Sequence, residues 1–170
     1  MRPLVATPHV RPSQRERASG SGCAKHVKKL VAAELGGKRV FLLDSITWLG
    51  SEDMGQIVIT GSHGGRSAGE YAITVVLALC CFNDAGVGKE GAGIVALDML
   101  QQRGGPCLAY SHNSARIGNA RDAWRNGIIS HVNAPAAKLG FTVGEPLQRA
   151  IVRTFDPRAT ATIGATDALQ

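Results

Sequence analysis

Apolar residues recur along the chain in short continuous runs, each followed by a glycine-rich or polar segment. Four of these runs are too short for helices. They are typical of strands that are buried on both faces of a parallel sheet. The strands that this pattern predicts span residues 38–44, 56–60, 77–82 and 107–110.

Between these runs, apolar residues recur at the helical spacing of three to four positions. The first predicted helix covers residues 23–35, where the apolar positions from Val27 to Leu35 share one face and Gly36 and Gly37 would end the helix. The other helices that the spacing predicts span residues 66–73, 90–102, 119–126, 128–140 and 144–154.

Residues 128–140 also allow a second interpretation. The segment Ile128-Ile129-Ser130 alone suits a short strand, and Pro135 would kink a helix unless the helix starts near Asn133. We favour a mostly helical segment here.

The alternation of strand, glycine-rich loop and helix predicts an α/β fold. We expect a three-layer sandwich with a mostly parallel sheet of about four or five strands, similar to Rossmann and flavodoxin-like folds. A chain of 170 residues suits one hydrophobic core. We therefore expect a single domain over residues 23–154, preceded by a proline-containing arm, 1–22, and followed by a tail, 155–170.

The positive charge of the chain is concentrated near its start. Residues 1–39 hold nine of the 19 Lys and Arg residues and two of the 13 Asp and Glu residues, so the remainder is close to neutral. Such an arm could bind nucleic acid through phosphate contacts, but no aromatic residue lies among its basic residues to stack on a base. We interpret it as a solvated terminus, with nucleic-acid binding as an alternative.

The cysteines and the apolar runs indicate a cytoplasmic protein. Cys23, Cys80, Cys81 and Cys107 show no Cys-x-x-Cys spacing, which favours reduced thiols. The longest apolar run, 72–82, is far shorter than the roughly 20 residues of a bilayer span, so we expect no membrane partner. The first 17 residues also lack the apolar region of a signal peptide. The sequence also allows a homo-oligomer.

Polar residues gather in three segments that follow predicted strands. Because the carboxyl ends of parallel strands lie along one edge of the sheet, where open α/β sheets bind ligands, these segments predict a common site. His63, Asp84 and His112 each follow a different strand, and we expect the two imidazoles to carry protons while Asp84 orients them. The residues that we expect to bind the substrate are Ser62, Gly64, Gly65, Asn83, Asn113, Ser114 and Arg116.

The partner that these residues suit is a small anionic molecule. Backbone N–H groups of a glycine-rich loop can surround an anion, and the Arg116 guanidinium can hold a carboxylate or phosphate with two hydrogen bonds. We expect hydrolytic or acid/base chemistry on such a metabolite. A non-catalytic ligand-binding or assembly protein is the alternative that would use the same pocket. The dipeptide Ser-His also occurs three times, at 62–63, 111–112 and 130–131.

Two further chemistries fit the same segments. His63, Asp84 and His112 could hold a divalent metal with an open position, although the local spacings of known zinc motifs are absent. Alternatively, Cys81 beside His63 could form a nucleophilic thiolate. The placement of His-Gly and Cys on successive strands resembles that of caspase-type cysteine peptidases, but Cys81 lacks their flanking pattern. A nucleoside triphosphatase is disfavoured, because Asn83 and Glu90 replace required residues of the phosphate-binding loop.

Overall fold

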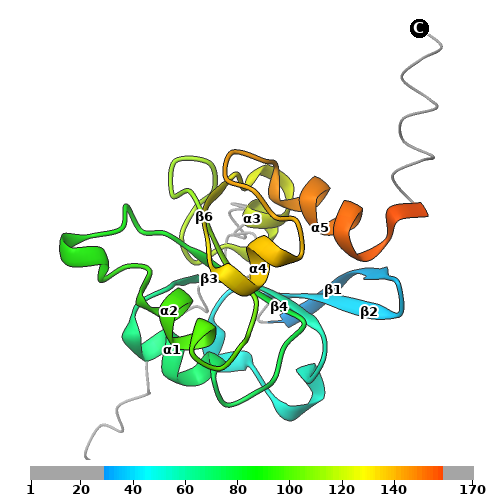
Figure 1. Ribbon diagram of the computed structural model, residues 1–170, viewed down its shortest axis with the longest axis horizontal. Coiled ribbons are helices and arrows are strands. Elements are labelled where there is room, and N and C mark those ends of the chain that lie inside the picture. Colours follow the sequence, from blue (N-terminus) through cyan, green and yellow to red (C-terminus); the bar gives the residue numbers. More distant parts are fainter. Residues whose placement is uncertain (1–28, 159–170) are drawn as a thin grey trace, which may run out of the picture.

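The computed structural model describes residues 29–158 of the chain, and a six-stranded sheet runs through this part (Figure 1). The strands lie in the sheet in the same order as in the sequence. The four inner strands are parallel to one another, and the first and last strands pair antiparallel to their neighbours. In chain order, the strands are β1 (Lys29–Leu35), β2 (Lys38–Leu43), β3 (Ile57–His63), β4 (Leu79–Asn83), β5 (Cys107–Tyr110) and β6 (Ile129–Val132).

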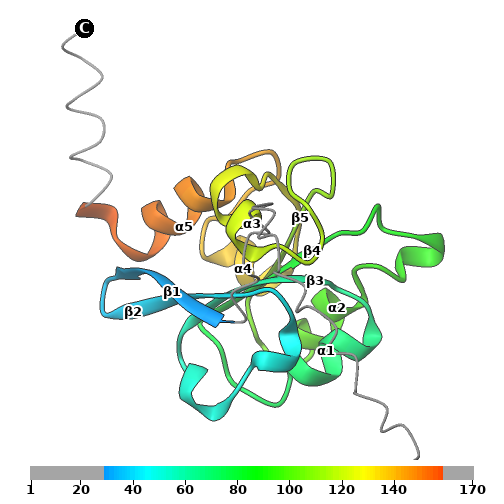
Figure 2. The same ribbon diagram turned by 180° about the vertical axis from the view of Figure 1, so that it is seen from behind.

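Helices cover the two faces of the sheet, because successive side chains of each buried strand point to opposite faces. On β4, Cys80 and Phe82 join the apolar cluster beneath the first two helices, whereas Cys81 joins the cluster beneath the later ones. The helices, in chain order, are α1 (Arg66–Ala72), α2 (Val95–Gln101), α3 (Ala120–Asn126), α4 (Ala134–Lys138) and α5 (Leu147–Phe155). Figure 2 shows α3 and α5 on the face opposite α1 and α2.

The strand order explains this distribution. From β3 through α1 to β4, and from β4 through α2 to β5, the chain steps to the next strand in the same direction. Right-handed crossovers that keep one direction place their helices on one face. The predicted α/β class with a mostly parallel sheet is confirmed. The strand order contains no reversal of the kind that defines Rossmann and flavodoxin-like folds, so that finer prediction is not confirmed.

Residues 29–35 form strand β1, so the helix predicted for residues 23–35 is wrong over this part; residues 23–28 lie outside the described residues. Gly36 and Gly37 have φ angles of 55° and 78°, as required at both central positions of a two-residue hairpin turn. The turn reverses the chain so that β2 runs back along β1, with Leu35 opposite Lys38. Hairpin pairing with β2 therefore outweighs the helical spacing of the apolar residues in this strand.

Residues 128–140 divide into strand β6 and helix α4, which corrects the mostly helical prediction. Pro135 causes no kink because it lies in the first turn of α4, where its missing N–H is not needed. Asn133 caps this helix by accepting a hydrogen bond from the Ala136 N–H at 3.0 Å. This short strand and the hairpin account for the sheet being wider than predicted.

The predicted helix over 90–102 begins later than expected, with α2 starting at Val95. Glu90 and Gly91 have φ angles of 56° and 76°, which no α-helix contains. The segment between β4 and α2 is therefore a long polar loop that follows the strand. None of the helices in residues 29–158 has the length and apolar character that crossing a bilayer requires.

Candidate functional site

The carboxyl ends of β3, β4 and β5 lie along one edge of the sheet, as the sequence predicted. Strand register places His63 of β3 opposite Asn83 of β4, and Asn83 opposite Tyr110 of β5. The Asp84 N–H then donates to the Tyr110 carbonyl oxygen at 2.9 Å. The loops after β4 and β5 are thus joined directly beyond the ends of their strands.

Asp84 and His112 form a hydrogen-bonded pair at this edge. The Nδ1 atom of His112 lies 2.7 Å from Oδ1 of Asp84. The same oxygen accepts the backbone N–H groups of Gly86 at 2.9 Å and of His112 at 3.0 Å. Asp84 is only 4% exposed, whereas the His112 side chain is 45% exposed. A fixed carboxylate therefore holds an imidazole that reaches solvent.

Hydrogen bonds set the charge of Asp84. Burial by itself raises the pKa of its carboxyl group, but donors from Gly86, His112 and the Ser130 hydroxyl more than offset this, and the net pKa is lowered. Asp84 is consequently an anion at neutral pH. An anionic acceptor at Nδ1 keeps the proton on that nitrogen and leaves Nε2 of neutral His112 as a base.

Asn83 holds the two loops in place. Its side chain is fully buried, and its Nδ2 group donates to the Ala115 carbonyl oxygen at 3.1 Å in the loop after β5. Its Oδ1 atom accepts the Ala85 N–H at 2.8 Å in its own loop. Both hydrogen-bonding groups of the amide are used within the protein, so Asn83 supports the Asp84–His112 pair and does not itself offer groups to a substrate.

The loop after β4 has an unusual backbone. Four successive residues, 85–88, have positive φ angles, and two of them, Ala85 at 48° and Val87 at 67°, are not glycine. Such conformations cost of order 1 kcal/mol or more each and persist only where the surroundings enforce them. The loop is closed by a hydrogen bond from the Gly93 N–H to the Val87 carbonyl oxygen at 2.7 Å.

His63 lies on the neighbouring strand and is exposed. Its Nδ1 atom accepts the Gly65 N–H at 3.2 Å, so the proton of the neutral ring is on Nε2. Within residues 29–158, His63 makes no hydrogen bond to Asp84 or His112. The Gly64 N–H donates to the Asn83 carbonyl oxygen at 3.1 Å. Because the N–H groups of Gly64 and Gly65 are both engaged, the predicted anion-binding use of these two glycines is not supported.

The other predicted substrate-binding residues divide into structural and exposed ones. The Ser62 hydroxyl accepts the Ile46 N–H at 3.0 Å. The Ser114 hydroxyl bridges the Ser111 carbonyl oxygen and the Ile128 N–H. Asn113 is exposed beside His112. The Arg116 side chain lines a depression next to α3.

The predicted metal site is not formed. In the part of the chain that the structure describes, no group of three or more His, Cys, Asp or Glu side chains is arranged to hold a metal ion. His63, Asp84 and His112 therefore do not constitute a metal-binding triad.

The Cys81 alternative also lacks support. Cys81 is fully buried, and burial raises the pKa of its thiol well above the ordinary value. A nucleophilic cysteine needs the opposite, an accessible thiolate with a lowered pKa. Cys81 instead contributes to the apolar core between the sheet and α3.

Ser130 is the residue at this site that sequence reasoning missed. It lies on β6, where its hydroxyl donates to the Ala109 carbonyl oxygen at 3.2 Å and lies 3.1 Å from Nδ1 of His131. It also contributes to the lowered pKa of the Asp84 carboxyl group. The repeated Ser-His dipeptide was the available signal, since His112 of the dipeptide 111–112 hydrogen bonds to Asp84 and Ser130 of the dipeptide 130–131 influences the pKa of Asp84.

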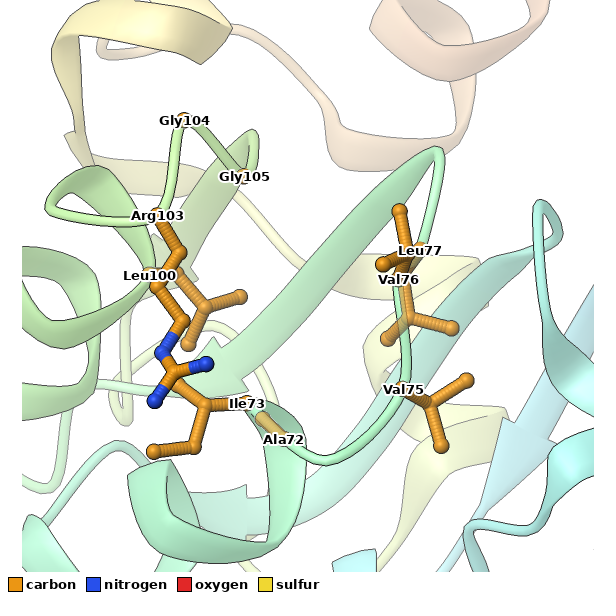
Figure 3. A pocket seen from close by; sticks show the side chains of 9 residues that line it. All are labelled: Ala72, Ile73, Val75, Val76, Leu77, Leu100, Arg103, Gly104 and Gly105. Atoms are coloured by element: carbon orange, nitrogen blue, oxygen red, sulfur yellow. The ribbon is translucent and has the colours of Figure 1, made fainter.

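An apolar hollow of about 290 Å³ lies at the opposite edge of the sheet (Figure 3). It is bounded by the ends of α1 and α2 and by the segments that lead into β4 and β5, and Arg103 is the charged residue among those that line it. The Arg103 side chain extends across this space toward Ile73 (Figure 3). The residues that line this hollow include neither a histidine nor a carboxylate, in contrast to the carboxyl edge.

Comparisons of the chain with protein-family models, with curated protein sequences and with solved structures gave no match.

Proposed function

We propose that the carboxyl edge of β4 and β5 binds a small anionic metabolite and performs acid/base chemistry on it, with His112 as the proton carrier and Asp84 as its orienting anion. The observation that carries the proposal is the 2.7 Å contact between Nδ1 of His112 and the nearly inaccessible Asp84 carboxylate. A buried aspartate that orients a partly exposed histidine is an arrangement that suits a general base.

The geometry favours chemistry on water or on a substrate proton over covalent catalysis. Within residues 29–158, no serine, threonine or cysteine side chain hydrogen bonds to Nε2 of His112, whereas an activated nucleophile has its base within hydrogen-bonding reach. A water or a substrate hydroxyl would occupy that position. Hydrolysis of a small carboxylate, amide or phosphate-bearing compound is the reaction class that fits.

His63 is the second proton carrier of the proposal. It ends β3, the strand next to β4, is exposed, and carries its proton on Nε2 when neutral. A base in the loop after β5 and a donor at the end of β3, on the two sides of β4, could act on opposite sides of one substrate bond. The two residues then have separate roles, because they share no hydrogen bond.

The test measures turnover of a panel of phosphomonoesters, amides and carboxylic esters by the full chain and three variants. His112→Ala and Asp84→Asn should each lower kcat by about 10²- to 10⁴-fold, the usual contribution of a positioned acid or base. Asp98→Asn, which removes an exposed carboxylate on α2, should leave kcat unchanged.

Two results would contradict the proposal. Turnover that survives both His112→Ala and Asp84→Asn would place the reaction elsewhere. Saturable binding of a panel member without any turnover, lost in the same two variants, would instead identify a non-catalytic ligand-binding protein.

A further inference from the structure

A depression beside α3 collects three arginine side chains that the acid/base chemistry does not use as a group. It has a volume of about 480 Å³. The residues that line it are Arg116, Asn119, Arg121, Asp122, Arg125 and Asn126. All three arginines are exposed, and none forms an ion pair with an acid in residues 29–158. Three unpaired guanidinium groups around one concavity require an explanation.

The fold holds this depression in a fixed shape. Asn119 caps α3 by accepting the Asp122 N–H at 2.9 Å, and the Gly118 N–H donates to the Gly61 carbonyl oxygen at 2.7 Å. A side chain at Gly61 would lie 2.6 Å from the backbone nitrogen of Asn119, which shows how closely β3 and this loop approach. The backbone around Arg116 is therefore tied to the sheet.

Asp122 does not neutralise the arginines through side-chain pairing. Its Oδ2 atom accepts the backbone N–H of Arg116 at 2.8 Å, and its Oδ1 atom accepts the Asn126 amide at 2.7 Å. These hydrogen bonds lower the pKa of its carboxyl group. The charge of Asp122 attracts Arg116, but among residues 29–158 neither Asp122 oxygen forms an ion pair with a guanidinium group.

The spacing of Arg121 and Arg125 supports a binding role. They lie four residues apart on α3, where like charges repel and destabilise a helix. An anion between them would remove that repulsion. Guanidinium groups bind phosphate with two parallel hydrogen bonds, which suits a concavity with several of them.

We propose that this depression binds the phosphate group of a small phosphorylated molecule. A hollow next to it also contains Arg121 and Arg125 and is lined in addition by Leu30, Val31 and Leu42. A phosphate held by the two arginines would leave space there for an apolar part of the ligand. A compact concavity lined by three arginines fits a discrete phosphate, whereas a nucleic-acid site has an extended basic stripe.

The proposal does not rest on the acid/base function, whose proposed residues, His112, Asp84 and His63, do not line the depression. Its experiment is calorimetric titration of the full chain with inorganic phosphate and with phenyl phosphate. Phenyl phosphate should bind more tightly than inorganic phosphate, and both should weaken at high sodium chloride concentration. The double variant Arg121→Ala/Arg125→Ala should weaken phenyl phosphate binding by about tenfold or more.

The matched control is Arg103→Ala/Lys138→Ala, which removes two exposed positive charges that do not line the depression. This control should keep affinity within about twofold, since only screened long-range charge is lost. Turnover at the carboxyl edge should persist in Arg121→Ala/Arg125→Ala, which separates this proposal from the acid/base function. Alanine at exposed helical positions is well tolerated, so the double variant should fold.

Three outcomes would overturn the phosphate site. The first is that phenyl phosphate shows no saturable binding to the full chain. The second is that Arg121→Ala/Arg125→Ala binds phenyl phosphate as tightly as the parent protein. The third is that the full chain binds a single-stranded oligonucleotide but not phenyl phosphate. The last result would identify a nucleic-acid surface.

Discussion

Asp53 and Asp84 are the two buried aspartates of the described chain, and they hold different kinds of partner. Asp53 is inaccessible and Asp84 is 4% exposed. The Oδ2 atom of Asp53 contacts Nζ of Lys29 at 2.7 Å and accepts the Gly50 N–H at 2.9 Å. Asp84 holds His112 at the same distance of 2.7 Å. Similar burial and geometry therefore occur with a lysine in one place and a histidine in the other.

The two aspartates differ in the chemistry of their partners, Lys29 and His112. Burial lowers the pKa of the Lys29 amine, but its hydrogen bonds to Asp53 and Glu52 outweigh this and raise the net pKa, so Lys29 stays charged. Its side chain is 21% exposed and also lies over the Phe41 ring. The His112 side chain is more exposed, at 45%, and its imidazole has a second ring nitrogen that can take part in proton transfer. One aspartate thus anchors β1, and the other orients a group that can exchange protons.

The largest expected effect comes from Asp53→Ala. It removes the buried partner of Lys29 and the acceptor for Gly50, and breaking a buried ion pair from one side costs about 3 kcal/mol. Urea unfolding at neutral pH should show this loss. Turnover or ligand binding at the carboxyl edge, measured below the unfolding transition, should be unaffected because Asp53 has only a structural role.

Glu52→Gln is the matched control for that variant. Glu52 also contacts Lys29, at 2.6 Å, but its side chain is 62% exposed. Solvent screens exposed ion pairs, so the urea midpoint should change little. Equal destabilisation by the two variants would show that burial is not what distinguishes Asp53.

The next effect in size concerns the loop that fixes Asp84. A side chain at Gly93 would lie 2.7 Å from the carbonyl oxygen of Asp84 and 2.9 Å from that of Val87. Backbone atoms cannot move aside cheaply, so Gly93→Ala should cost about 2 kcal/mol. It should also shift the NMR signals of the His112 ring, because the loop that carries Asp84 must move.

Gly105→Ala provides the comparison for Gly93→Ala. A side chain at Gly105 would meet the Leu100 carbonyl oxygen at 3.4 Å, an ordinary contact, and its φ angle is not in the left-handed region. We expect stability within about 0.5 kcal/mol of the parent protein. Unchanged His112 signals in Gly93→Ala would mean that the Asp84 loop is not held by this close approach.

The sequence predicted the centre of the sheet well because the signal there is local. A continuous apolar run such as 77–82 is buried on both faces wherever the helices lie, and Asp84 and His112 follow strands that must end at one edge. Strand β1 was missed for the opposite reason. Its apolar positions fit a helix equally well, and only pairing with β2 decides between the two.

The site was predicted in part. The proximity of Asp84 and His112 could be predicted from the order of strands and loops. The directions in which the other side chains point could not. Arg116 lies four residues after His112, yet it lines the depression beside α3. Ser130 reaches Asp84 from an edge strand that the sequence pattern left ambiguous. The polar residues after each strand indicate which edge of the sheet carries a site. The hydrogen-bond partner of each polar side chain depends on how distant parts of the chain pack together.

The smallest expected effect is the pH dependence of stability that Asp84 contributes. Its folded pKa is lowered, so its hydrogen bonds stabilise the protein above the unfolded value of about 4 and are lost as pH falls through the folded pKa. Asp84→Asn should therefore cost about 1 kcal/mol at neutral pH, and this difference from the parent protein should shrink on acidification below about pH 4. Urea unfolding of both proteins between neutral and acid pH measures it. The same measurements on Asp53→Asn test whether losing the lysine partner lowers the free energy of unfolding at neutral pH more than losing the histidine partner does. A difference for Asp84→Asn that stays constant down to the lowest pH would show that Asp84 is not the anion that holds His112.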